Sequence, residues 1–96
     1  MKILVIEREV PGVKVEQYSP HLKVEALKVW KLYQSGKVRE FYFSKGNFAV
    51  LILECSDEDE ASEILDSLPL VKEGLIKFDV IPLLPYPGFS RLFEKE

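Results

Sequence analysis

The sequence is poor in the residues that build most metal sites and nucleophilic centres. Its 96 residues include one cysteine, Cys55, and one histidine, His21. A single cysteine excludes an internal disulfide and a cysteine-cluster metal site, and we expect no metal ion and no cofactor. No basic residue adjoins Cys55 in the sequence, so we expect a small core residue rather than a reactive thiol. His21 is expected at the surface rather than in catalysis.

Long hydrophobic runs and an excess of positive charge are also missing. The net charge is −3 and the isoelectric point is near 5.2, which provides no basic field for nucleic acid. No apolar run approaches the roughly 20 residues of a membrane span. The apolar start at residues 3–6 is ended by Glu7-Arg8-Glu9 and is too short for a signal peptide. We therefore expect a cytoplasmic protein that binds neither nucleic acid nor membrane.

The composition that remains is that of one ordinary globular domain over residues 1–96. Hydrophobic residues make up 47% of the chain and charged residues 30%, which argues against disorder. A chain of this length buries only about 60–65% of its unfolded surface, so its stability alone would be marginal. Help from a partner subunit is therefore expected.

The order of expected elements is β-α-β-β-α-β, the pattern of the ferredoxin-like fold. Strands are expected at residues 2–8, 38–44, 48–55 and 75–83. Ser19-Pro20 opens one helix, which Gly36 stops, and a second helix runs from Ser56 to a stop at Pro69. The first and third strands are apolar on both faces and should be central, whereas Pro82 places the fourth at a sheet edge. The predicted class is α+β, with a four-stranded antiparallel sheet and two helices on one face.

The face of the sheet without helices is expected to be apolar enough to need a cover. We assign Phe41, Phe43, Phe78 and Val80 to the helix side, and Val38 to the other side with Tyr42. The residues assigned to the helix-free face are Ile3, Val5, Tyr42, Phe48, Val50, Ile52, Ile81 and Leu83. Such a face covers roughly 300–400 Å², near the largest patch that a monomer exposes. The expected partner is a second copy of the chain, joined through this face.

The C-terminal segment, residues 85–96, is expected to be a docking tail. Phe89, Leu92 and Phe93 share one side of a short helical turn, and Tyr86 precedes them. A tail this apolar should pack on protein, either on its own domain or on a neighbouring subunit.

Polar residues on the helix-free face are the candidates for chemistry. The set is Glu7, Glu40, Tyr42, Glu54, Lys77 and Asp79. Proton transfer needs a base with a pKa raised by burial, an acid, and a cation for an anionic substrate. We predict Glu40, Tyr42 and Lys77 as catalytic residues and Glu54, Asp79 and Ile52 as ligand-binding residues. The alternative is that these polar side chains lie at strand ends, solvated or paired across strands.

Three features resemble muconolactone isomerase and its relatives in the dimeric α/β-barrel superfamily. They are the total length, Ser35-Gly36-Lys37 before the second strand, and Leu68-Pro69-Leu70 followed by Phe78-Asp79-Val80-Ile81-Pro82-Leu83. The resemblance implies a homodimer whose sheets face each other across a cavity, within a larger ring in which tails contact neighbours. Tyr42-Phe43 stands where the family has Trp-Arg, and Tyr86-Pro87-Gly88 where it has His-Pro-Ser.

Two functions of different classes remain open from the sequence. The first is a cofactor-free isomerase of the muconolactone isomerase kind that acts on a small lactone or organic acid in the dimer cavity. The second is a homo-oligomeric assembly or small-ligand-binding module of the same fold, without catalysis. A buried carboxylate opposite a cation would favour the first function, whereas a barrel filled by Tyr42, Phe48 and Ile52 would favour the second.

Overall fold

The computed structural model describes residues 1–94 and contains one four-stranded antiparallel sheet in the order β2-β3-β1-β4. The strands are β1 (Lys2–Glu9), β2 (Val38–Phe43), β3 (Ala49–Glu54) and β4 (Ile76–Leu83). The two strands predicted to be central, β1 and β3, are central, and Pro82 lies on the edge strand β4. The predicted α+β, ferredoxin-like class is confirmed.

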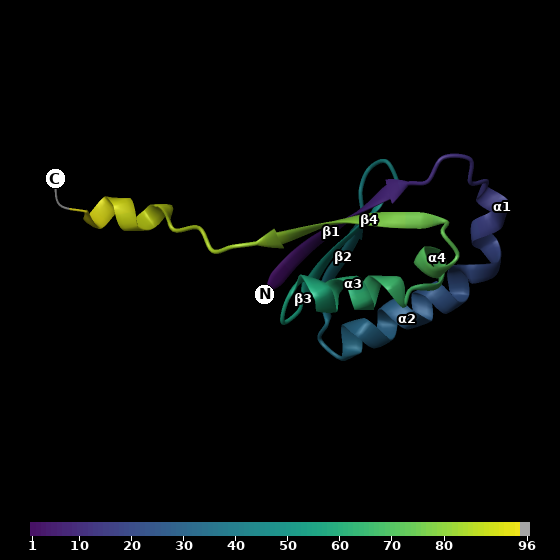
Figure 1. The fold of residues 1–96 in the computed structure, drawn as a ribbon, viewed down its shortest axis with the longest axis horizontal. Helices are drawn as coiled ribbons and strands as arrows, with labels where there is room; N and C mark the ends of the chain where they lie inside the picture. Colours follow the sequence, from purple (N-terminus) through teal and green to yellow (C-terminus); the bar gives the residue numbers. More distant parts are fainter. Residues whose placement is uncertain (95–96) are drawn as a thin grey trace.

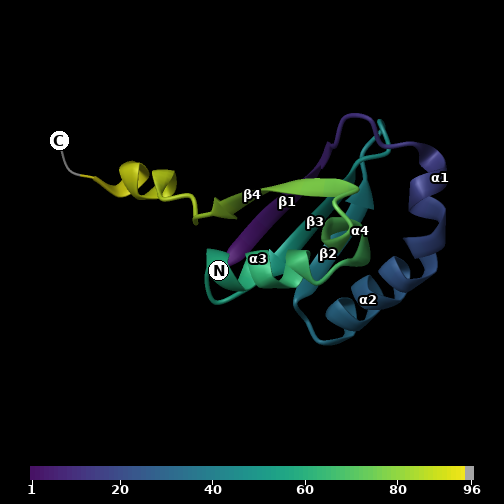
Figure 2. The same ribbon diagram turned by 45° about the vertical axis from the view of Figure 1, so that its right-hand side comes forward.

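The helices cover one face of this sheet (Figures 1 and 2). They are α1 (Val15–Tyr18), a 3-10 turn η1 (Ser19–His21), α2 (Leu22–Gln34), α3 (Glu58–Asp66) and α4 (Pro69–Lys72). A second 3-10 segment, η2 (Gly88–Phe93), follows the sheet. A short helix, α1, therefore precedes Ser19, where the sequence predicts the helix to begin. Pro69 does not end the second helix directly but begins the separate short helix α4, whose first position suits its fixed φ.

Helix ends show where local chemistry set the boundaries. Gly36 adopts a φ of 82°, and the amides of Gly36 and Lys37 bond back to the carbonyls of Tyr33 and Leu32 at 3.1 and 3.0 Å. This is the glycine stop that the sequence predicts at the end of α2. The cap of α3 is Asp57 rather than Ser56, since the Asp57 carboxylate accepts the Glu60 amide hydrogen bond at 2.8 Å.

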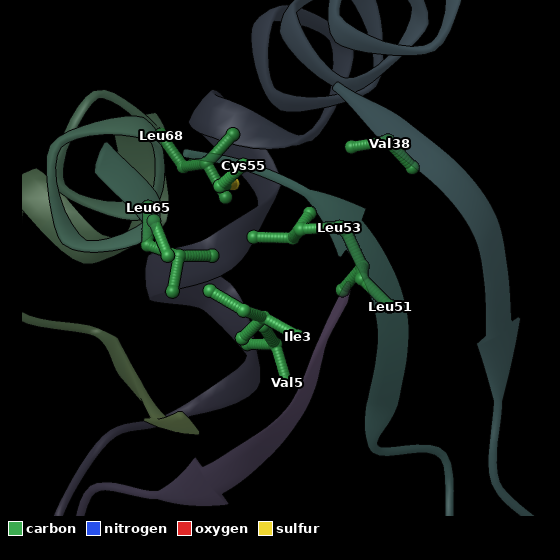
Figure 3. Packing of buried hydrophobic residues seen from close by; sticks show 9 residues of the cluster. Ile3, Val5, Val38, Leu51, Leu53, Cys55, Leu65 and Leu68 are labelled. Carbon is green, nitrogen blue, oxygen red and sulfur yellow. The ribbon is translucent and has the colours of Figure 1, made fainter. Parts of the chain in front are cut away.

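The main core lies between the sheet and helix α3, and Val29 and Leu32 of α2 pack against it (Figure 3). Its fully buried members include Ile3, Val5 and Leu53. The assignment of Ile3 and Val5 to the helix-free face was therefore wrong. Both sides of β1 are apolar, so alternation alone did not fix its phase; the pairing of Ile3 with Leu53 and of Val5 with Leu51 does. Leu4 and Ile6 occupy the helix-free face instead.

A β-bulge in β2 explains a second error. Val38 pairs with Leu53, whereas Glu40 pairs with Ile52, so Arg39 is an extra residue in the strand. The bulge directs the Val38 side chain into the core, where it is 1% exposed, although it was predicted to lie on the helix-free face. Beyond the bulge the prediction is right for Phe41, whose ring packs edge-on against Tyr33 of α2 with centroids 5.4 Å apart.

The C-terminal tail extends away from the sheet and helices (Figures 1 and 2). It leaves the end of β4 that is remote from α1, and it gives the chain a longest dimension of 61 Å. Tyr86 and Phe89 pack edge-to-face with each other, yet Phe89, Leu92 and Phe93 are 68–83% exposed. The described part of the tail therefore does not dock on its own domain. Lys95 and Glu96, the end of the predicted tail, lie outside the described residues.

Candidate functional site

The predicted site residues on the helix-free face do not converge within one chain. Glu40 and Tyr42 lie on edge strand β2, and the Tyr42 hydroxyl donates a 2.7 Å hydrogen bond to the Glu40 carboxylate. This bond raises the pKa of Tyr42, because deprotonation would break the hydrogen bond and place a phenolate beside the Glu40 carboxylate. Lys77 lies on the opposite edge strand, β4. Two strands separate the edges, which places them about 14 Å apart.

The remaining predicted residues of this face are partnered or apolar. Asp79 accepts a hydrogen bond from Nε of Arg8, a cation that the sequence analysis had not placed on this face. Glu54 forms an ion pair with the Met1 ammonium at 3.2 Å. Ile52 is half-buried between Leu4 and Glu40 on the neighbouring strands. The face thus has an apolar centre with charges of both signs around it.

Glu7 lies on the helix side, and its assignment to the helix-free face was wrong. It follows Ile3 and Val5 at a spacing of two, so the corrected phase of β1 directs it beneath the helices. Its carboxylate accepts a 2.9 Å hydrogen bond from the Ala49 amide at the start of β3.

A large cavity lies between α2 and the sheet, on the same side as Glu7. Its volume is about 930 Å³, and its walls come from α1, η1, α2, α4 and all four strands. The wall is mainly apolar and rich in aromatic side chains, namely Tyr18, Trp30, Phe41, Tyr42, Phe43, Phe48 and Phe78. Two of these, Tyr42 and Phe48, were predicted to belong to the helix-free face alone, yet both line this cavity. No residue of α2 is fully buried; Val29 and Leu32 pack against the core, and the cavity occupies space left between the rest of this helix and the sheet.

Glu25 of α2 is the titratable group of greatest interest in this cavity. One carboxylate oxygen accepts a 2.9 Å hydrogen bond from the Leu70 amide in α4, and the other has no hydrogen-bond partner within residues 1–94. Burial raises the pKa of Glu25; the Leu70 bond opposes the rise, and the nearby Glu7 carboxylate adds to it. A carboxyl group with a raised pKa in an apolar cavity suits general acid–base chemistry.

Other titratable groups offer less. Burial raises the pKa of the Cys55 thiol, so its reactive thiolate is disfavoured and the predicted role as a core residue agrees with its 4% exposure. Among residues 1–94, no group of three or more His, Cys, Asp or Glu side chains is arranged to hold a metal ion. His21 is half-buried at the end of η1, close enough to Glu25 to lower its pKa slightly.

Glu25 was not among the predicted site residues, although the sequence carries a signal for it. Leu22, Glu25 and Val29 recur at spacings of three and four, so Glu25 lies on the sheet-facing stripe of α2. A carboxylate on an apolar stripe needs either a partner or a function. The Leu70 amide is a partner for one of the two carboxylate oxygens.

The helices of the described region are too short or too polar for any of them to cross a membrane. No protein-family model and no curated protein sequence matches the chain.

Among solved structures, the chain is similar to 5-chloro-2-hydroxyhydroquinone dehydrochlorinase from Burkholderia phenoliruptrix, in complex with 2,5-dihydroxybenzoquinone. The TM-score is 0.73 at 17% sequence identity, and the match covers 92% of this chain and 98% of that one. At this identity the likeness concerns the fold alone. The chain therefore has the ferredoxin-like fold on which dimeric α/β barrels are built.

Proposed function

We propose that this protein is a cofactor-free enzyme that moves a proton on a small ring compound, such as a lactone, bound between α2 and the sheet. The observation that carries the proposal is Glu25, a desolvated carboxyl group with one oxygen free in an aromatic cavity of about 930 Å³. Cavities of roughly 300–1,000 Å³ are typical of small-molecule sites. The reaction class is an isomerisation of the muconolactone isomerase kind.

The chemistry asked of Glu25 is simple. Its carboxylate takes a proton from the carbon next to a carbonyl group, which leaves an enolate, and the resulting carboxylic acid returns the proton to another carbon of the conjugated system. The raised pKa makes Glu25 a stronger base than an exposed glutamate. The Leu70 amide fixes one oxygen and so orients the other. Ser19 and Asn47 add neutral hydrogen-bonding groups to the cavity wall.

The fold likeness supports the general class but not the reaction. The neighbouring structure belongs to a dehydrochlorinase, an enzyme that acts on a small ring compound. Its match covers nearly all of both chains, so this fold is one that accommodates such chemistry. The assignment of proton transfer to Glu25 rests on the cavity alone.

The helix-free face is proposed as the homodimer interface rather than the catalytic site. Its apolar centre, formed by Leu4, Ile6, Val50, Ile52 and Ile81, is only partly covered in one chain. Lys2, Arg8 and Lys77 lie on this face together with Glu40, Glu54 and Asp79. A surface that carries both signs around an apolar centre can be complementary to itself across a twofold axis.

Deuterium exchange tests the proposed function. The protein is incubated in D₂O with a panel of unsaturated lactones and cyclic ketones, and loss of the ring proton signals is followed by NMR. We expect catalysed exchange with at least one panel member, reduced at least 100-fold in Glu25→Gln, since general-base catalysis contributes about 10²–10⁴-fold. The matched control is Glu63→Gln on the exposed side of α3. Exchange that is equal in Glu25→Gln and wild type would refute the role of Glu25.

A further inference from the structure

The charges of the cavity wall are all of one sign. Glu7, Glu9 and Glu25 line it, and none of its lining residues within the described chain is Lys, Arg or His. A carboxylate ligand would therefore meet like charges in a mainly apolar environment, where the interaction is weakly screened. The sequence predicts a small anionic or lactone-like ligand beside Lys77, but Lys77 lies on the other face of the sheet from this cavity.

Two of these carboxylates are held in the same manner. Glu7 bonds the Ala49 amide through Oε1, and Glu25 bonds the Leu70 amide through Oε1, both at 2.9 Å. In each case the second oxygen has no hydrogen-bond partner in the part of the chain that the structure describes. The two groups are close enough for Glu7 to raise the pKa of Glu25. The cavity therefore presents two fixed acceptors that lack donors.

The rest of the wall specifies the body of the ligand. Trp30 on α2, Phe41 on β2 and Phe48 before β3 offer flat apolar surfaces from different sides of the cavity. Aromatic walls of this kind favour a planar ring through burial and stacking. A ligand with a net charge of either sign would lose much more hydration free energy against this wall than a neutral ring would.

We infer that the cavity binds an uncharged planar ring that carries two O–H or N–H donors, and that Glu7 and Glu25 select such a ring against anions. One donor meets the free oxygen of Glu7 and the other meets that of Glu25. Glu7 is then a specificity-determining residue beside the proposed base. The inference rests on the proposed function only in taking this cavity as the site.

A matched pair of ligands tests the charge rule directly. Resorcinol is a neutral ring with two O–H groups, and 3,5-dihydroxybenzoate is the same ring with a carboxylate. Trp30 is the only tryptophan of the chain and lines the cavity, so its single indole N–H signal in a ¹⁵N–¹H spectrum reports occupancy. Near pH 7 we expect resorcinol to shift this signal at millimolar concentration, with the benzoate at least tenfold weaker.

Two variants separate the charge effect from shape. Glu7→Gln keeps the side-chain length and an oxygen for the Ala49 amide but removes the charge; Glu25→Gln does the same at Leu70. Each should reduce the preference for resorcinol over the benzoate at least threefold, and Glu63→Gln should leave it unchanged. If one variant fails to fold, the other still decides the question.

Three results would overturn the inference: equal or tighter binding of the benzoate, tighter binding of the cationic 3,5-dihydroxybenzylamine than of resorcinol, or no shift of Trp30 with resorcinol. Each is independent of the deuterium-exchange result. Exchange without resorcinol binding would leave Glu25 as a base but refute the ligand class. Selective binding of resorcinol without any exchange would support the ligand class but refute the role of Glu25 as a base.

Discussion

Substitution of Ile52 by aspartate tests the proposed dimer most sharply. Ile52 lies on central strand β3, half-buried, with Leu4 opposite it on β1 and Glu40 opposite it on β2. When two such faces meet, both copies of the new carboxyl group are buried, and each lies beside a Glu40 that repels it. A buried polar group without a partner costs about 2–3 kcal/mol, so the dimer loses about 4–6 kcal/mol in total.

That loss corresponds to a dissociation constant raised about 10³–10⁴-fold, because each 1.4 kcal/mol is a factor of ten. Sedimentation velocity at about 10 μM should show the wild type as a dimer and Ile52→Asp as a monomer, with circular dichroism confirming that the variant is folded. Ser62→Asp makes the same charge change on the exposed surface of α3, on the helix side of the sheet, and should remain dimeric. A monomeric wild type, or a variant that still dimerises with the same constant, would refute the interface.

Four further outcomes are expected. Burial places the folded-state pKa of Glu25 above its unfolded value. The wild-type free energy of unfolding is therefore highest at pH values below the unfolded pKa, and it falls as the pH rises through the folded pKa. Urea unfolding of Glu25→Gln should show less of this decline as the pH rises above about 4, and an identical decline would contradict the burial argument. Asp57→Ala should lower the unfolding free energy by about 1 kcal/mol, measured by the same method, through loss of the α3 cap. Leu53→Ala should cost about 2–5 kcal/mol, since Leu53 is fully buried in the core. Removal of residues 85–96 should weaken self-association in sedimentation, because the exposed apolar tail has no contact surface on its own domain; unchanged association, or fast amide exchange across Phe89 to Phe93 in the intact protein, would contradict docking on a neighbour.

The element order and sheet order were predictable because each strand and helix has its own local signal. Local signals coincide with boundaries in the structure: Gly36 ends α2, Asn47 adopts a φ of 66° in the turn before β3, and Pro82 lies on the edge strand β4. The two faces of β1 were not predictable in the same way. Leu4 and Ile6 are as apolar as Ile3 and Val5, so a pattern of period two has no preferred phase there.

The cavity was the least predictable feature. It depends on how far α2 stands from the sheet, and no local pattern in the sequence specifies that distance. Glu25 meets Leu70 across 45 residues of sequence, and Glu7 meets Ala49 across 42. Pairings at such separations follow from the register of β1 against β3 and from the position of α4. Glu40 and Tyr42 lie on one edge strand and Lys77 lies on the other, so the three predicted residues do not converge.

The bulge at Arg39 has a consequence for how this chain can aggregate. An open sheet exposes two edge strands whose free amides and carbonyls can recruit further strands, the route by which sheets grow into fibres. Here one edge is interrupted by the bulge in β2 and the other by Pro82 in β4, which has no amide hydrogen to offer. Each interruption breaks the row of hydrogen-bonding groups that an added strand would need. The chain should therefore resist fibre growth through its sheet edges.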